Sequence, residues 1–154
     1  MKLFCSEFCS EGHPDKVCDI VSDSILDECL RFDPNAHVAV ETLASNGKIV
    51  LAGEVSPSVK FANLEKACLD AVSSIGYHAI DFNVENIVHF QSSEINSAVS
   101  KERTGAGDIG MMFGYAVYST VTNFLPPTLY FARAIIESLT EKRKSGYNFL
   151  KPIA

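Results

Sequence analysis

Apolar residues recur at helical spacing in the first third of the chain. A proline at position 14 precedes this pattern and suits the first turn of a helix. The pair Asp33-Pro34 disfavours continuation of a helix. The sequence therefore predicts a helix from Pro14 to about Arg31 with one buried face. That face consists of Val17, Val21, Ile25 and Cys29.

A second face of the same predicted helix is acidic. Its four aspartates are spaced four residues apart, so they stack along one stripe. The first two lie near the helix N-terminus, where the macrodipole favours negative charge. A solvated acidic face is the alternative interpretation, above all for the last two. The four residues are Asp15, Asp19, Asp23 and Asp27.

Two runs of β-branched residues follow, at 38–43 and 48–55, and Ser45-Asn46-Gly47 separates them. Asn-Gly between such runs favours a tight hairpin, because both residues accept positive φ. Glu41 and Glu54 each interrupt one of these predicted strands. A carboxylate on a mostly buried strand is costly unless it binds a cation or an amine, so both are candidate site residues. The alternative is an edge strand on which they face water.

The middle of the chain predicts a second helix and a third strand. Asn63 is a suitable cap, residues 64–75 carry an apolar stripe, and Gly76 is a typical stop. Residues 84–90 have the composition of a strand. Residues 92–104 are polar and irregular, and a segment of that length suits a lid over a site.

The glycines in residues 105–110 have G-x-G-x-x-G spacing. A dinucleotide-binding loop of this type needs a buried strand before it and a helix after it. Here polar residues precede the glycines, and an apolar run at 111–118 that predicts a strand follows, so a Rossmann fold is not expected. The glycines still allow the backbone to approach a ligand closely.

A final helix is predicted after Pro126-Pro127. Its last turn contains Lys142-Arg143-Lys144, and Gly146 is a suitable C-terminal cap. The basic residues complement the helix dipole, and a solvated helix end is the leading interpretation of this cluster. The apolar stripe of this helix consists of Leu129, Ala132, Ile135, Ile136 and Leu139.

Composition narrows the possible classes of protein. The chain has 154 residues, 47% of them hydrophobic, which is enough for one globular domain with a core. A net charge of −6 argues against broad binding to nucleic acid or to anionic membranes. No apolar run is long enough for a signal peptide or a membrane span, so a cytoplasmic protein is expected. Five cysteines, an odd number, favour reduced thiols over disulfides.

The segment richest in candidate catalytic and binding side chains is Ser10-Glu11-Gly12-His13-Pro14-Asp15-Lys16. His13 can donate to a phosphate oxygen, Asp15 offers a hard ligand for Mg²⁺, and Lys16 adds a cation. These three residue types together favour the handling of a polyphosphate. A zinc site built from Cys5, Cys9 and His13 is the alternative, but it lacks a fourth ligand and matches no common zinc spacing.

Five motifs together closely resemble the S-adenosylmethionine synthetase (methionine adenosyltransferase) family, and they occur in family order. They are residues 10–16, Val40-Glu41-Thr42, Ala52-Gly53-Glu54, residues 105–110 and residues 112–116. The resemblance implies an α/β (α+β) fold in which a mixed or antiparallel sheet packs with helices. This would be an incomplete version of a three-domain, pseudo-threefold fold. Residues 1–101 would be the N-terminal domain with most of the lid, and residues 102–154 the lid end, the glycine-rich segment and the start of the central domain.

The resemblance also implies a reaction. Methionine sulfur would attack C5′ of ATP and displace tripolyphosphate, which is then hydrolysed to phosphate and pyrophosphate, with Mg²⁺ and K⁺ as cofactors. The implied catalytic residues are His13, Asp15 and Lys16. The implied ATP contacts are His13, Gly107 and Asp108, and the implied methionine contacts are Glu54, Ser97 and Asp108. Asp15 would bind Mg²⁺ and Glu41 would bind K⁺.

The chain departs from the family at several positions and in length. Ser97 and Ile109 stand where the family has glutamine, Ala98 where it has glycine, and Ile153 where it has aspartate. Family members are much longer, so the C-terminal portion, which supplies most of the basic residues that bind triphosphate, is absent. The family's site lies between subunits, which implies a homo-oligomer or a hetero-oligomer with a complementary or full-length synthetase. Activity would need a partner chain or the missing segment of a longer enzyme. The alternatives are a non-catalytic homologue that binds or regulates a full-length synthetase, and an inactive truncated product.

Overall fold

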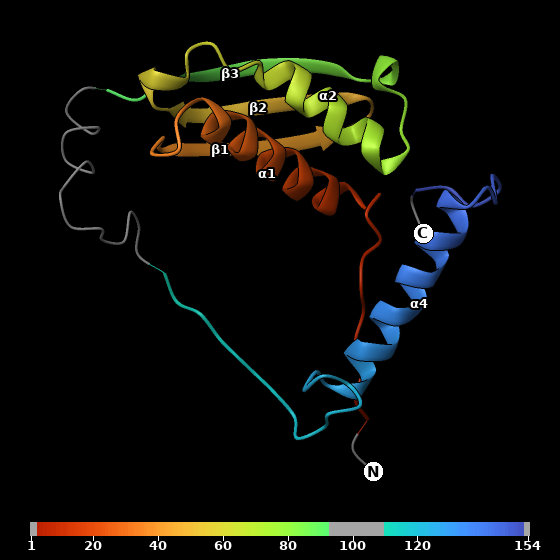
Figure 1. Cartoon of the computed structure of the whole chain (residues 1–154). Helices are drawn as coiled ribbons and strands as arrows, with labels where there is room; N and C mark the ends of the chain where they lie inside the picture. The colour runs from red at the N-terminus through yellow and green to blue at the C-terminus, as the bar shows by residue number, and fades with distance from the viewer. Residues whose placement is uncertain (1–2, 93–109, 153–154) are drawn as a thin grey trace. The chain divides into compact units, whose positions relative to one another are not determined.

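The computed structural model describes residues 3–92 and 110–152 (Figure 1). The chain divides into two compact units. The larger is Pro14–Gly107, and the smaller combines Met1–His13 with Asp108–Ala154. The larger unit is a three-stranded sheet with two helices, and the smaller unit is built around one long helix.

The sheet has the strand order β1-β2-β3. Strand β1 (Val38–Ser45) pairs antiparallel with β2 (Lys48–Val55), and β2 pairs parallel with β3 (Asn83–Phe90). The turn between β1 and β2 has Asn46 at φ 47° and Gly47 at φ 71°, the two positive angles that a tight hairpin turn requires. The predicted hairpin and the third strand are therefore confirmed, and of the mixed or antiparallel sheet that was expected the structure has the mixed form.

Helices α1 (Pro14–Phe32) and α2 (Leu64–Ile75) cover the same face of this sheet (Figure 1). Both helices match the sequence predictions closely. The side-chain oxygen of Asn63 accepts a hydrogen bond from the Lys66 amide at 2.9 Å, which caps the start of α2. Gly76 ends α2 with φ 106°, in the left-handed region. Short 3₁₀ turns at Pro57–Val59 and Ala79–Asp81 flank α2.

The core of the larger unit lies between the two helices and the covered face of the sheet. Helix α1 buries the four residues of its predicted apolar stripe, and α2 buries its own stripe against them. The opposite face of the sheet is open, and Leu43 and Ile87 on it are 67% and 56% exposed. The core residues are Val17, Val21, Ile25, Cys29, Val40, Ile49, Leu51, Val55, Val59, Leu64, Cys68, Ala71, Val72 and Ile75.

The smaller unit is organised by helix α4 (Pro127–Lys144). The N-terminal segment contacts the start of this helix and the segment that follows it. The hydroxyl groups of Ser6 and Thr128 are 2.7 Å apart, and Ser10 Oγ donates to the carbonyl of Pro152 at 3.0 Å. The helix itself is confirmed, but no residue of α4 is buried, so its predicted apolar stripe forms no core here. None of the helices in the described ranges combines the length and the apolar character needed to cross a membrane.

The strand predicted for residues 111–118 is wrong. These residues form no regular element, and the apolar side chains of Met112 and Phe113 are exposed. A strand is stable only when its backbone groups pair with a neighbouring strand, and an apolar run does not supply that neighbour. The part of the chain that the structure describes contains no strand that pairs with this segment.

Candidate functional site

His13 closes a tight turn that begins at Ser10, which we call the His13 turn (residues 10–13). The amide of His13 donates to the carbonyl of Ser10 at 3.1 Å. Ser10 is 3% exposed and Gly12 is also buried, while His13 itself is half-buried. The histidine is therefore held at the end of a packed turn, as a ligand-contacting side chain requires.

Glu11 in the same turn pairs with two cations from the end of α4. Its carboxylate accepts a hydrogen bond from Arg143 Nη2 and another from Lys144 Nζ, the latter at 3.0 Å. The Arg143 side chain is only 12% exposed and that of Glu11 23%. The expectation of a solvated helix end is therefore wrong for Arg143. The reason is a contact between residues 132 positions apart, for which the local sequence holds no signal.

Asp15 and Lys16 lie in the first turn of α1, in the larger unit. Asp15 is placed where the helix dipole favours a carboxylate. Lys16 Nζ lies 3.4 Å from Asp19 Oδ2, and both side chains are largely exposed. An exposed pair of this kind contributes at most about 1 kcal/mol, so a phosphate can displace Asp19 from Lys16 at low cost.

Glu41 and Glu54 lie on the open face of the sheet, away from α1 and α2. Glu41 is opposite Ala52 and Glu54 is opposite Ala39, so the two carboxylates are diagonal neighbours across β1 and β2. Glu41 is exposed and Glu54 is half-buried, so the expectation of mostly buried strands is wrong for Glu41. A sheet covered by helices on one face only leaves its other face to water.

Glu54 has a partner that sequence reasoning did not find. Its Oε1 atom lies 3.2 Å from His89 Nε2, on the neighbouring strand β3. The two residues are directly opposite in the parallel register. On the same face, Lys48 Nζ and Glu85 Oε2 form another cross-strand pair at 2.5 Å. Charged side chains of both signs thus line the open face beside the exposed apolar residues.

No group of three or more metal-ligating side chains exists in residues 3–92 and 110–152. Mg²⁺ carried on a nucleotide does not need such a group, because that ion keeps several waters and uses one or two carboxylates plus substrate phosphates. Asp15 has the donor chemistry and the exposed position for such a contact.

The cysteines form no site among the described residues. All five are free thiols, and the exposed Cys5 and Cys9 belong to no metal-ligating group in the part of the chain described. Burial raises the pKa of Cys68 to about 11, and it also raises the pKa of Cys29. A thiol that stays protonated and buried is a poor nucleophile, so these two residues are packing groups.

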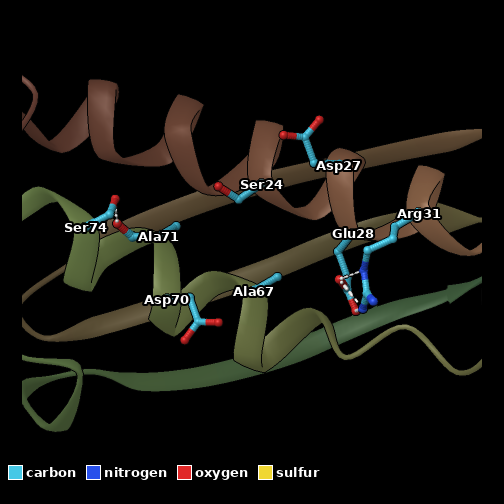
Figure 2. Close-up of a pocket in the computed structure, with 8 residues that line it drawn as sticks. All are labelled: Ser24, Asp27, Glu28, Arg31, Ala67, Asp70, Ala71 and Ser74. Carbon is cyan, nitrogen blue, oxygen red and sulfur yellow. Dashed lines mark hydrogen bonds and ion pairs between the residues drawn. The ribbon is translucent and has the colours of Figure 1, made fainter.

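A groove of about 380 Å³ lies between α1 and α2, on the side of the helices away from the sheet (Figure 2). Some of the charged side chains at the rim of this groove form ion pairs with one another. Figure 2 shows Arg31 turned toward Glu28, and Arg31 Nε donates to Glu28 Oε2 at 3.0 Å. None of the predicted site residues lines this groove. The lining residues are Ser24, Asp27, Glu28, Arg31, Ala67, Asp70, Ala71 and Ser74.

Three predicted site residues, Ser97, Gly107 and Asp108, lie outside the described residues, as does most of the predicted lid at 92–104. The structure brings Glu41 and Glu54 to one face of the sheet, and it places Asp15 and Lys16 on a helix that covers the other face.

Comparison with known proteins shows which family models match this sequence. The model for the S-adenosylmethionine synthetase N-terminal domain matches residues 1–102. The model for the central domain of S-adenosylmethionine synthetase matches residues 103–153.

Curated proteins that are similar to this chain are named S-adenosylmethionine synthase. The chain is 43% identical over 169 aligned residues to the S-adenosylmethionine synthase of Brachyspira hyodysenteriae, which covers 97% of this chain and 42% of that protein. It is 42% identical to the S-adenosylmethionine synthase of Phocaeicola vulgatus, over 99% of this chain and 38% of that protein. It is 44% identical to that of Parvibaculum lavamentivorans, over 94% of this chain and 39% of that protein. The chain thus spans about two fifths of the length of these curated relatives.

Proposed function

Because the chain belongs to the S-adenosylmethionine synthetase family, we propose that it supplies part of the active site of a methionine adenosyltransferase. The proposed reaction converts ATP and L-methionine to S-adenosylmethionine, phosphate and pyrophosphate. The observation that carries the proposal is the match of consecutive synthetase domains to residues 1–102 and 103–153. The chain spans about two fifths of its relatives, and the proposed activity needs either a partner chain, such as a full-length synthetase, or the remaining segment of a longer enzyme.

The proposed chemistry is a displacement at carbon. The methionine sulfur forms a bond to C5′ of the ribose while the C5′–oxygen bond breaks, and tripolyphosphate leaves with the electron pair. Water then cleaves the tripolyphosphate to phosphate and pyrophosphate. Such a displacement needs no protein nucleophile, so the rate depends on alignment of the reactants and on stabilisation of the departing negative charge.

We assign the triphosphate to three residues around the start of α1. His13 would donate a hydrogen bond to a phosphate oxygen, and Lys16 would add positive charge. Asp15 would hold Mg²⁺, which when bound neutralises part of the triphosphate charge. The fixed His13 turn and the accessible positions of Asp15 and Lys16 support this assignment. Gly107 and Asp108 are assigned to ATP by their motif alone.

We assign methionine to Glu54, Ser97 and Asp108, and K⁺ to Glu41. A carboxylate on an open surface suits the ammonium of an amino acid or a monovalent cation, since both remain partly hydrated. The open face that carries Glu41 and Glu54 also exposes Leu43 and Ile87. A partner chain that covers this face, either a second copy or a full-length synthetase, would complete the methionine site.

Complementation tests the proposal. A full-length synthetase whose equivalent of His13 is changed to alanine is purified alone and together with this chain, and supplied with ATP, methionine, Mg²⁺ and K⁺. S-adenosylmethionine and phosphate are both measured. We expect product only in the mixture. The same mixture with the His13→Ala variant of this chain should give none, whereas the surface control Glu65→Gln should match the unchanged chain.

The other outcomes are equally decisive. Product formed by this chain alone would overturn the requirement for a partner chain or a missing segment. A mixture without product, in which the two chains nevertheless bind each other, would overturn the catalytic proposal in favour of a non-catalytic homologue. An absence of both product and binding would favour an inactive product.

A further inference from the structure

The His13 turn is fixed by contacts from the C-terminal end of the smaller unit. Ser10 is 3% exposed, and its hydroxyl donates to the carbonyl of Pro152 at 3.0 Å. The same serine accepts the amide of His13 through its own carbonyl. One residue thus connects the backbone that carries His13 to a segment 142 positions away.

Gly12 allows the backbone of the His13 turn to lie very close to the backbone of Pro152. A Cβ atom placed on Gly12 would lie 2.3 Å from the carbonyl carbon and oxygen of Pro152. Distances below 3.0 Å require the backbone to move. Glycine is therefore needed here for close approach of two backbone segments.

Glu11 supplies the third contact and the largest electrostatic one. Its two oxygens accept hydrogen bonds from different cations, Arg143 and Lys144. The Arg143 side chain is 12% exposed, whereas both partners of the Arg133–Glu137 pair on the same helix are about half exposed. A partly buried, charge-assisted hydrogen bond is stronger than an exposed one because water screens it less.

We propose that Arg143 is a positioning residue, which through Glu11 fixes the conformation of the His13 turn for polyphosphate binding. The inference rests on the proposed function for the role of His13. The contact of Arg143 with Glu11, which we call the Arg143 clamp, does not depend on that function. Arg143 acts in two ways. It holds the turn in place, and together with Lys144 it offsets the carboxylate of Glu11, which would otherwise repel a phosphate two residues away at His13.

The test measures amide hydrogen exchange at His13 and binding of Mg²⁺–tripolyphosphate, both on the full chain. In Arg143→Met and Glu11→Gln we expect exchange at His13 to rise about tenfold or more, since one hydrogen bond to a charged group is lost. Affinity for tripolyphosphate should fall by a similar factor in Arg143→Met, and by less in Glu11→Gln, because that variant also removes the carboxylate that repels phosphate. Arg143→Lys should restore part of both. Glu137→Gln, which breaks only the exposed pair on α4, should change neither, and helical ellipticity reports whether each variant is folded.

Unchanged exchange at His13 in both clamp variants would overturn the proposal. Faster exchange with unchanged tripolyphosphate affinity in Arg143→Met would also overturn it, provided that His13→Ala itself lowers this affinity. If His13→Ala leaves the affinity unchanged, the phosphate role of His13 under the proposed function is wrong, and the exchange measurement still decides whether Arg143 holds the turn.

Discussion

Glu54 Oε1 lies 3.2 Å from His89 Nε2, at directly opposite positions of the parallel strands β2 and β3. The carboxylate assigned to methionine therefore already has a partner on its own sheet. An incoming ammonium group would compete with this histidine for the same oxygen.

His89→Ala should consequently strengthen methionine binding by up to about fivefold, because an exposed pair of this kind contributes about 0.2–1 kcal/mol. Glu54→Gln should weaken binding by about tenfold or more, since the ammonium loses a charged partner. Calorimetric titration of methionine in the presence of ATP, Mg²⁺ and the partner synthetase measures both. Glu85→Gln, which removes the neighbouring pair with Lys48, is the matched control and should have no effect.

Gly53→Ala should destabilise the larger unit by roughly 1–3 kcal/mol or more, because Gly53 has φ 133° and an added Cβ would lie 2.0 Å from the carbonyl oxygen of Ala39. Urea denaturation followed by circular dichroism measures the loss. Gly114→Ala, where an added Cβ meets nothing within 4 Å, should leave stability unchanged. Equal stability of the two variants would contradict the described β1–β2 pairing.

Ile25→Ala should cost about 2–5 kcal/mol of unfolding free energy, since Ile25 is fully buried between α1 and the sheet. The neighbouring Leu26 is 38% exposed, and Leu26→Ala should cost much less. The same denaturation experiment compares them. Similar losses at the two positions would mean that α1 packs through a different face.

Thiol labelling should separate the cysteines by position. Cys5 and Cys9 are exposed and should react first, whereas Cys29 and Cys68 are fully buried and should react only on unfolding. With a pKa of about 11, Cys68 is about 0.1% thiolate at pH 8, and that fraction rises about tenfold per pH unit. Timed labelling with mass spectrometry between pH 7 and 9 checks this order. Early labelling of Cys68 would contradict its burial beneath α1 and α2.

Prediction from sequence succeeded where the signal is local. The four-residue spacing from Val17 to Cys29 predicted the buried face of α1, and Asn63 and Gly76 predicted both ends of α2. Asn46 and Gly47 predicted the hairpin turn. In each case the residues that determine the conformation are close neighbours in sequence, so caps, turns and periodicity suffice.

The candidate site was predictable in part. The sequence singled out His13 and Glu54, but not their surroundings. Arg143 was expected in water and is mostly buried against Glu11, and His89 was not singled out at all. Both partners come from distant positions in the sequence. The sequence on either side of a residue does not indicate which distant residues will pack beside it.

The sequence by itself therefore determined the two helices of the larger unit, the hairpin and the family, because these follow from short-range spacing and from motifs in a fixed order. Only the tertiary structure decided that residues 111–118 form no strand and that Glu41 faces water. It also decided that Glu11 in the His13 turn pairs with Arg143 and Lys144 of α4. The physical reason is the same in all three cases. Strand pairing, side-chain exposure and ion pairing depend on neighbours in space, and those neighbours are set by the packing of the whole unit.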